Sequence, residues 1–249
     1  MNGMTNGAVA GQPLRFGRRL TRALARQCGD ALIASYLHGS SVLGGWTEHR
    51  SDVDMLLIVA ADGAGTMADG LGRSLVALSP GCPGRGLEVS VVTTAQAAAP
   101  MSPYGYLLHY GDGRLVDGRG QAAGDDDLLM HYAVCRAAGY PLLGPPPPSL
   151  IAPSDRRAVL NYLAAELDWG LANAPESYAV LNACRAAEYL ETGQIVSKVA
   201  GGSAALRRNL GPPELIRRAL DQQRGLIGER PSGPDAVAFV AGIRDRLRS

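Results

Sequence analysis

The sequence predicts an α+β protein in which a domain built on a mixed sheet is followed by a helical domain. In the first part of the chain, short apolar runs typical of strands alternate with longer segments of helical spacing. From about residue 153 onward the periodic segments all have helical spacing. Four prolines, Pro145–Pro148, separate the two patterns. We therefore expect one domain over residues 1–152 and a second over residues 153–249.

The first domain is predicted to begin with a basic helix and to contain three main strands. Apolar residues recur at helical spacing over residues 14–31, and LIASYLHG then predicts a short strand. SDVDMLLIVA predicts a central strand, and ADGLGRSLVALSP a helix after it. LEVSVVT alternates with period two, which predicts a strand with one apolar and one polar face.

The remaining segments are predicted to be a helix, a connector and a helical bundle. DDDLLMHYAVCRAAG fits an amphipathic helix whose acidic start suits the N-terminal dipole. The proline run cannot continue a helix or a sheet, so we expect a stiff extended connector there. Four helices are predicted beyond it, at residues 155–172, 176–193, 211–226 and 234–249.

Composition places the chain among ordinary globular proteins and argues against several classes of function. Its formal net charge is only +1 at pH 7, so it lacks the electrostatic footprint of a nucleic-acid-binding protein. The four cysteines form no CxxC pair, which favours reduced thiols in the cytoplasm over a disulfide framework. Neither a signal-like N-terminus nor an apolar run of ~20 residues is present, so we expect no membrane anchor. No zinc spacing links the four histidines, which receive no role: His38, His49, His109 and His131.

Two aspartates one residue apart, Asp52 and Asp54, open the central predicted strand. Side chains at positions i and i+2 of a strand leave from the same face, so the two carboxylates should lie close together. Clustered anions repel unless a cation lies between them, and Mg²⁺ is usually held by one or two carboxylates together with substrate phosphates. The pair therefore indicates a magnesium site, although the D-x-D pattern also occurs at turns and strand ends.

A Gly-Ser pair precedes the aspartates and a third carboxylate follows them. Eleven residues separate Ser40 from Asp52. A glycine such as Gly39 lets the backbone approach a phosphate, and the serine hydroxyl and nearby N–H groups can donate to it. Glu88 lies on the polar face of LEVSVVT, so the three acids converge if that strand neighbours the aspartate strand. The alternative interpretations are a simple turn and a surface glutamate.

These residues resemble the polymerase-beta-type nucleotidyltransferases, which use a Gly-Ser turn and three acids to transfer nucleoside monophosphates. More narrowly, the chain resembles the aminoglycoside adenylyltransferases that modify streptomycin and spectinomycin. The resemblance covers about residue 32 to beyond residue 205, in the stretches LHGSSVLGGWTEHRSDVDMLLIV, LEVSVV, DLLMHYAVCRAAGYPLLGPPP and VLNACRAAEYLETGQIVSKVAG. It implies a polymerase-beta-like domain, with a mixed sheet flanked by helices, followed by an α-helical bundle.

The resemblance also implies an activity: Mg²⁺-dependent transfer of AMP from ATP to a hydroxyl of an aminoglycoside or aminocyclitol, in antibiotic resistance. Asp52, Asp54 and Glu88 would be the catalytic and metal-binding residues, with Glu88 as general base. The nucleotide-binding residues would be Gly39, Ser40, Ser51, Asp127, Arg185 and Lys198. The last two, thirteen residues apart, fall where the family contacts ATP phosphates across the interdomain cleft. Taken alone, each of these two cations could be a solvated charge.

A cationic acceptor needs carboxylates to receive it. Asp168 and Glu176, together with Glu166, lie near the junction of two predicted helices and are candidates for this role, with an acidic helix end in water as the alternative. Trp169 is expected to be a packing residue. The streptomycin-modifying members carry a tryptophan where Leu163 stands here, a departure that favours spectinomycin or another aminocyclitol.

Other functions stay open at this stage. They are nucleotide transfer to a biosynthetic small molecule, nucleotide transfer to a protein side chain, and non-catalytic nucleotide binding. Three intact acids speak against the last, and a whole helical domain speaks against a minimal protein-modifying transferase. The expected partners are ATP and a cationic small molecule, with Mg²⁺ as cofactor, no nucleic acid and no membrane. We expect a monomer in the cytoplasm.

Overall fold

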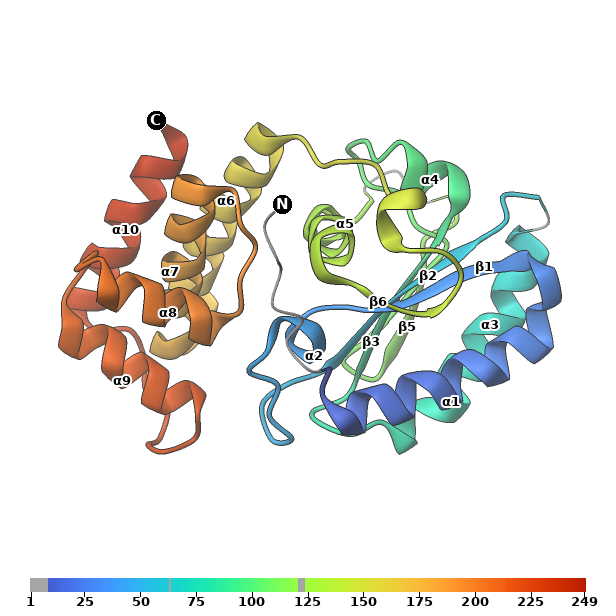
Figure 1. Cartoon of the computed structure of the whole chain (residues 1–249), viewed down its shortest axis with the longest axis horizontal. Coiled ribbons are helices and arrows are strands. Elements are labelled where there is room, and N and C mark those ends of the chain that lie inside the picture. Colours follow the sequence, from blue (N-terminus) through green and yellow to red (C-terminus); the bar gives the residue numbers. More distant parts are fainter. Residues whose placement is uncertain (1–8, 63, 121–123) are drawn as a thin grey trace. The chain divides into compact units, whose positions relative to one another are not determined.

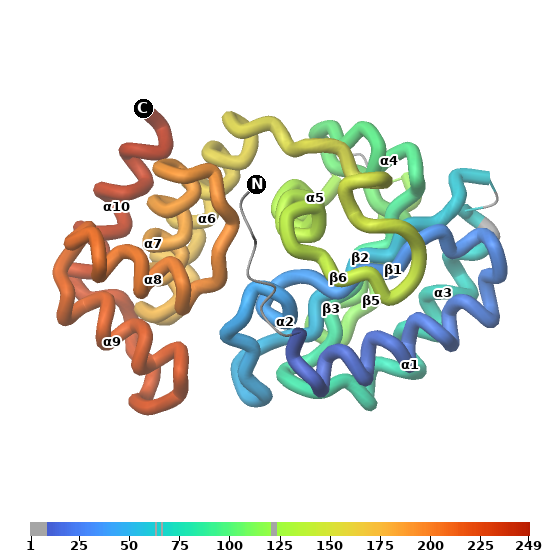
Figure 2. The backbone as a smooth tube through the Cα atoms, in the orientation of Figure 1, coloured from blue at the N-terminus to red at the C-terminus, as the bar shows by residue number. Residues whose placement is uncertain are grey.

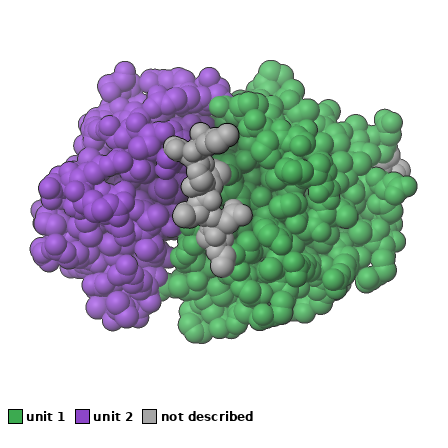
Figure 3. Space-filling model, viewed as in Figure 1, with its two compact units in different colours: residues 1–154 green, residues 155–249 purple. Residues whose placement is uncertain are grey.

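The computed structural model describes residues 9–62, 64–120 and 124–249. By its internal contacts the chain divides into two compact units, residues 1–154 and residues 155–249 (Figure 3). The sheet lies in the first unit, and the second unit is helical. The predicted α+β class, with a mixed sheet first and a helical part second, is confirmed.

A mixed sheet forms the centre of the first unit (Figure 1). Over the described residues it has six strands, in the order β5-β4-β3-β2-β1-β6. β2 and β3 are parallel, and the other neighbouring pairs are antiparallel. The strands are β1 Leu32–Leu37, β2 Val53–Val59, β3 Leu87–Thr93, β4 Leu108–Gly111, β5 Arg114–Asp117 and β6 Tyr140–Leu143. The predicted strands at β1, β2 and β3 are confirmed.

Helices cover both faces of this sheet. α1 (Gly11–Cys28) and α3 (Ala64–Leu78) lie on one face and α5 (Asp127–Ala138) on the other (Figure 1). β2 is buried at every position except Asp54, because a strand covered on both faces needs no polar alternation. The buried stripe of α1, at a spacing of four residues, is Phe16, Leu20 and Leu24. The shorter elements are α2 Ser40–Leu43, α4 Thr94–Ala98 and the 3₁₀ turns η1 Gly29–Ala31, η2 Ser79–Gly81 and η3 Pro147–Ser149.

Two local features differ from the predictions. Ser90, expected on a polar face of β3, is 1% exposed because α5 covers that face. The proline run is not simply extended, since its last two prolines enter η3, where the fixed φ of proline suits a helical turn. The Tyr36 hydroxyl fastens this segment to the sheet by donating to the Pro145 carbonyl at 2.8 Å.

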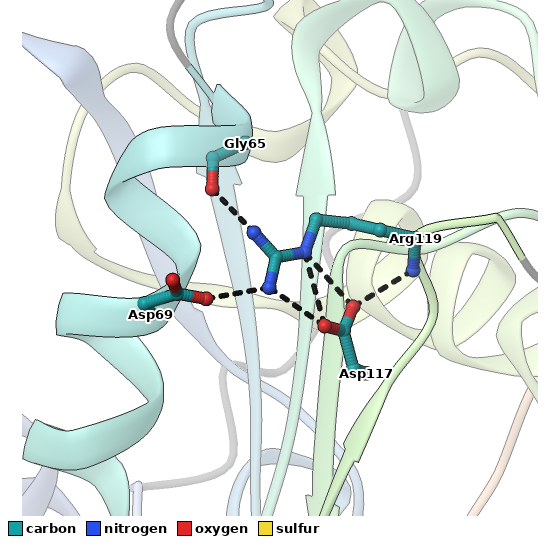
Figure 4. Close-up of polar contacts among 4 residues, drawn as sticks. All are labelled: Gly65, Asp69, Asp117 and Arg119. Atoms are coloured by element: carbon teal, nitrogen blue, oxygen red, sulfur yellow. Dashed lines mark hydrogen bonds and ion pairs between the residues drawn. The ribbon is translucent and has the colours of Figure 1, made fainter.

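A network around Arg119 holds the segment after β5 against α3 (Figure 4). The Nη2 atom of Arg119 lies 2.5 Å from Asp69 Oδ1 and 2.6 Å from Asp117 Oδ2. Its Nη1 atom donates to the Gly65 carbonyl at 2.5 Å. Exposed ion pairs contribute only ~0–1 kcal/mol each, so the network orients the edge of the sheet more than it stabilises the fold.

The second unit is a bundle packed around α7. α7 contacts each of the other helices of the unit (Figure 2). Ten of its residues are buried. The helices are α6 Arg156–Asn173, α7 Glu176–Thr192, α8 Lys198–Arg207, α9 Pro213–Gln223 and α10 Pro234–Arg248. The four predicted helices are confirmed, and α8 is an addition. Among the residues that the structure describes, no helix is long and apolar enough to cross a membrane.

α8 was not predicted, because two glycines interrupt its helical spacing of apolar residues. A Cβ on Gly201 would lie 3.0 Å from the Arg185 backbone nitrogen, and one on Gly202 would lie 2.9 Å from Leu181 Cδ2. The glycines therefore let α8 approach α7 closely, at the expense of helix propensity. Ser197 begins the helix by accepting a hydrogen bond from the Ala200 N–H at 3.1 Å.

Candidate active site

The Gly-Ser turn and Asp54 form one structural unit. Gly39 follows β1 with φ +61°, and a Cβ at this position would lie 1.8 Å from Asp54 Oδ2. The Ser40 backbone N–H donates to the Asp54 carboxylate, and the His38 N–H donates to the Asp54 carbonyl at 3.0 Å. Only glycine permits both this backbone conformation and the close approach of the carboxylate. The sequence therefore folds the turn directly against an acid of β2.

The parallel pairing of β2 and β3 brings the predicted acids together. Asp54 and Glu88 are register partners on the two strands. Asp52 immediately precedes β2 instead of lying within it, and its charge acts on Asp54. Burial, and after it the charge of Glu88, raises the pKa of Asp54 well above its ordinary value. Carboxylates crowded in this way are stabilised by a cation placed beside them.

This set of donors fits Mg²⁺ only in part. Within the described residues, no group of three or more His, Cys, Asp or Glu side chains is arranged to hold a metal ion. That Asp52, Asp54 and Glu88 together surround one ion therefore stays a prediction. Asp52 and Asp54 still offer hard oxygen atoms beside the Gly-Ser turn. Mg²⁺ commonly takes one or two carboxylates and completes its shell with phosphate and water.

The Glu88 carboxylate is instead held by a histidine that the sequence left unassigned. Nε2 of His131, on α5, donates to Glu88 Oε1 at 3.3 Å. Burial opposes ionisation of both groups, but their contact outweighs it, so the pKa of His131 rises to about 9 and that of Glu88 falls to about 2. Burial, followed by the nearby charge of His131, lowers the pKa of His38 to about 3. The sequence contained one usable signal, because His131 lies one helical turn after the predicted site residue Asp127.

A pocket of about 880 Å³ in the first unit collects several of these side chains. Asp52, Glu88 and Asp127 line it, together with His109 and Arg85. Arg85 Nε lies 4.0 Å from Asp52 Oδ1. Carboxylates outnumber guanidinium groups among the described lining residues, so the pocket favours a cationic ligand. Asp127 is exposed at the start of α5, where its N–H donates to Asp125 Oδ1 at 3.0 Å.

Ser51, a predicted nucleotide-binding residue, makes its hydrogen bonds within the turn ahead of β2. Its side chain is buried, and its hydroxyl accepts a hydrogen bond from the Thr47 N–H at 3.0 Å. The Ser51 N–H also donates to the Thr47 carbonyl at 3.0 Å. These contacts close the turn ahead of β2, so the Ser51 hydroxyl is engaged within this turn.

The two predicted cations of the second unit lie in one neighbourhood. Arg185, on α7, donates through Nε to the Val196 carbonyl at 3.0 Å and through Nη1 to Asn182 Oδ1 at 3.2 Å. The Nζ atom of Lys198, at the start of α8, lies 4.0 Å from the ring centroid of Tyr178. The charge of Arg185 also acts on Tyr178. Both cations are half-buried and held, unlike solvated surface charges.

Asp168 is paired within the second unit, and Trp169 packs at the surface of that unit. Asp168 Oδ1 lies 2.8 Å from Arg244 Nη1, and its Oδ2 lies 2.6 Å from Arg248 Nη2. The Asp168 carboxylate is thus already engaged by two arginines of α10. Trp169 is 51% exposed, so it is not a core residue. Its ring meets the ring of Tyr178 edge-on at 5.7 Å.

Glu176 departs further from the expectation of an open acidic site. Its side chain is 0% exposed at the start of α7. Arg218 Nε lies 2.7 Å from Oε1, and Arg230 Nε lies 3.5 Å from Oε2. An acid that is fully buried and neutralised inside the bundle cannot receive a ligand without breaking these pairs. The structure therefore assigns Glu176 to the stability of the second unit.

A mixed sheet with a Gly-Ser turn beside acids on two parallel strands, followed by a helical bundle, is the arrangement that the resemblance to nucleotidyltransferases implies. Residues 153–243 match the sequence model of a family described as "Aminoglycoside adenylyltransferase, C-terminal domain". The match covers nearly all of the second unit, and it agrees with the resemblance to aminoglycoside adenylyltransferases seen in the sequence.

The fold of the chain is similar to a crystal structure of the spectinomycin adenyltransferase AAD(9) from Enterococcus faecialis with ATP and spectinomycin. The TM-score is 0.68 at 19% sequence identity, and the match covers 93% of this chain and 98% of that chain. The likeness therefore extends over both units, and it is a likeness of fold.

Proposed function

We propose that this protein transfers AMP from ATP to a hydroxyl of a cationic aminocyclitol, with Mg²⁺ as cofactor and spectinomycin-like acceptors favoured over streptomycin. The observation that carries the proposal is the contact of the Gly39-Ser40 turn with Asp54, in register with Glu88. This combination places hydrogen-bond donors for a phosphate beside hard oxygen ligands for a metal ion and a carboxylate that can act as a base. The related fold solved with both ATP and spectinomycin supports the choice of substrates.

In the proposed reaction, the acceptor hydroxyl attacks the α-phosphorus of ATP. A bond forms between that oxygen and the phosphorus, the bond from the phosphorus to the bridging oxygen breaks, and pyrophosphate leaves. Glu88 takes the hydroxyl proton as general base. Ser40 donates to the triphosphate, and Asp52 and Asp54 are the residues that would hold Mg²⁺. When bound, the ion stabilises negative charge on the phosphoryl oxygens.

The proposal gives the remaining residues supporting roles. Arg185 and Lys198 would supply positive charge to the ATP phosphates, which is supported by their shared neighbourhood beside Tyr178. Asp127 would contribute to the nucleotide and metal site from the rim of the pocket. Because Asp168 and Glu176 are engaged by arginines, the acidic pocket of the first unit is the better candidate for the acceptor.

The test is a direct assay of transfer. The protein is incubated with ATP and Mg²⁺ and with spectinomycin, streptomycin or a neutral polyol, and pyrophosphate release is measured together with the mass of the acceptor. We expect an acceptor heavier by one AMP with spectinomycin, and no product after Mg²⁺ is chelated. ATP binding without product from any acceptor would indicate a binding module, and AMP found on protein would indicate a protein-modifying transferase.

A further inference from the structure

The ring of His131 bridges two side chains of the strand that carries the proposed base. Its Nε2 atom lies 3.3 Å from Glu88 Oε1, and its Nδ1 atom lies 3.4 Å from Ser90 Oγ. Glu88 and Ser90 are two residues apart on β3, so both side chains leave the strand on the face that α5 covers. Each ring nitrogen is thus turned toward a polar atom of the same strand.

The ring has a further neighbour in His38, and its partner Ser90 is itself held. His38 lies against it, with ring centroids 5.0 Å apart. Ser90 is 1% exposed, and its Oγ atom is also 3.1 Å from His109 Nδ1. The side chain of His131 is only 16% exposed. A largely covered polar ring with these oriented neighbours has little freedom to turn.

Glu88 needs such a support because its own side chain is long. A glutamate loses up to ~1.5–2 kcal/mol of rotamer entropy when it is held in one conformation. The backbone register fixes where Glu88 starts, but three side-chain torsions separate the backbone from the carboxylate. A contact to one oxygen atom removes this freedom and leaves the other oxygen for a substrate proton. A general base must lie within ~2.6–3.2 Å of that proton's oxygen, so small displacements matter.

We propose that His131 is the positioning residue for Glu88: its Nε2 atom holds Oε1, so that the second carboxylate oxygen is presented to the acceptor hydroxyl in the pocket. This inference rests on the proposed function, in which Glu88 is the base. His131 acts through Glu88 and does not touch the reacting atoms. Supports of this kind typically change activity by ~10–100-fold when they are removed.

A pair of nearly isosteric variants tests the position of the nitrogen. In His131→Gln the amide nitrogen falls near the place of Nε2, whereas in His131→Asn it falls near that of Nδ1. We expect His131→Asn to lower kcat ~10–100-fold with the KM for ATP little changed, and His131→Gln to recover most of the loss. The exposed His49, replaced by Gln, is the control for substitution of a histidine. Equal kcat for the Gln and Asn variants would overturn the inference.

A double-mutant cycle shows whether His131 acts through Glu88. In a Glu88→Gln background, His131→Asn should cause little further loss of kcat. Independent losses that multiply would overturn the inference while leaving the proposed function intact. A wild-type protein that transfers AMP to no acceptor would instead overturn the proposed function.

The contact itself is tested without any turnover. In the protein labelled with ¹³C and ¹⁵N in its histidines, the ring signals of His131 are identified by their loss in His131→Gln. Glu88→Gln should shift these signals and leave those of His49 in place. Signals of His131 that do not respond to Glu88→Gln would overturn the inference whatever the activity of the protein.

Discussion

The acids of the two units have opposite surroundings. In the first unit, Asp54 and Glu88 lie side by side across a parallel strand pair, and the charge of Glu88 makes ionisation of Asp54 harder. In the second unit, Asp168 and Glu176 each lie between two arginines. Crowded like charges need an external cation, whereas paired ones are already satisfied. The partners of a carboxylate therefore distinguish a candidate site from a structural ion pair better than its position in the sequence does.

The largest effect that this comparison predicts is on catalysis by the first unit. Glu88→Gln should lower kcat by ~10²–10⁴-fold, because it removes the proposed base. The free energy of unfolding should change by less than ~1 kcal/mol, since the lost contact with His131 is offset by relief of the repulsion with Asp54. Steady-state kinetics and urea unfolding measure the two quantities. If Glu88→Gln keeps its activity but unfolds at lower urea concentration, Glu88 stabilises the fold and is not the base.

The next effect concerns the backbone that carries the site. Gly39→Ala should lower activity at least ~100-fold, because the new Cβ would lie 1.8 Å from Asp54 Oδ2 and must displace that carboxylate. Gly44→Ala is the matched control, since Gly44 also has positive φ (83°) but nothing lies within 4 Å of its added Cβ. Both should lose ~1–2 kcal/mol through the left-handed backbone, and only the first should lose activity. Equal activities of the Gly39→Ala and Gly44→Ala variants would show that the Gly-Ser turn is not part of the active site.

A stability effect of intermediate size is expected in the second unit. Glu176→Gln should destabilise it by ~2–3 kcal/mol, because two arginines lose a fully buried partner. This is less than the ~3–5 kcal/mol of a wholly buried pair, since Arg218 and Arg230 are partly exposed. Urea unfolding measures the loss, and kcat should be almost unchanged. Glu214→Gln, in an exposed pair with Arg217, serves as the control and should change stability by under ~0.5 kcal/mol.

Sequence patterns predicted the elements whose formation depends on their own apolar and polar residues. β1, β2 and β3 are apolar runs, and four helices of the second unit have regular spacing. The β4–β5 hairpin and β6 have only four residues per strand, too short for a period to emerge. α8 carries two glycines that serve its packing against α7. Short strands and close helix contacts depend on neighbours that one segment of sequence does not reveal.

The same distinction holds for the site. The proximity of Asp54 and Glu88 could be predicted from the sequence, because adjacent parallel strands have a simple register. The partners of Asp168 could not, because Arg244 and Arg248 are 76 and 80 residues away in the chain. The contact of His131 with Glu88 likewise depends on which face of the sheet α5 covers, which spacing within the helix does not determine.

The smallest predicted effect tests whether Asp168 is a structural acid. Hydrogen bonds from Arg244 and then Arg248 outweigh its burial and lower the pKa of Asp168 below its ordinary value of 3.8. A carboxylate whose pKa is lowered by folding stabilises the folded state above its unfolded pKa, and this contribution is lost as the pH falls through the lower, folded value. Because the side chain is 41% exposed, screening limits the contribution to under ~1 kcal/mol.

Asp168→Asn should therefore weaken the second unit slightly at about pH 7, and the difference from wild type should vanish in strong acid, below the lowered pKa that Asp168 has in the folded state. Urea unfolding at several pH values measures this difference, and about 1 M salt should reduce it at neutral pH. Asp221→Asn, in a longer exposed contact of 3.9 Å with Arg224, is the matched control and should show a smaller dependence. Asp168→Asn could instead leave stability unchanged at every pH and raise the KM for the acceptor. In that case Asp168 binds substrate and is not a structural acid.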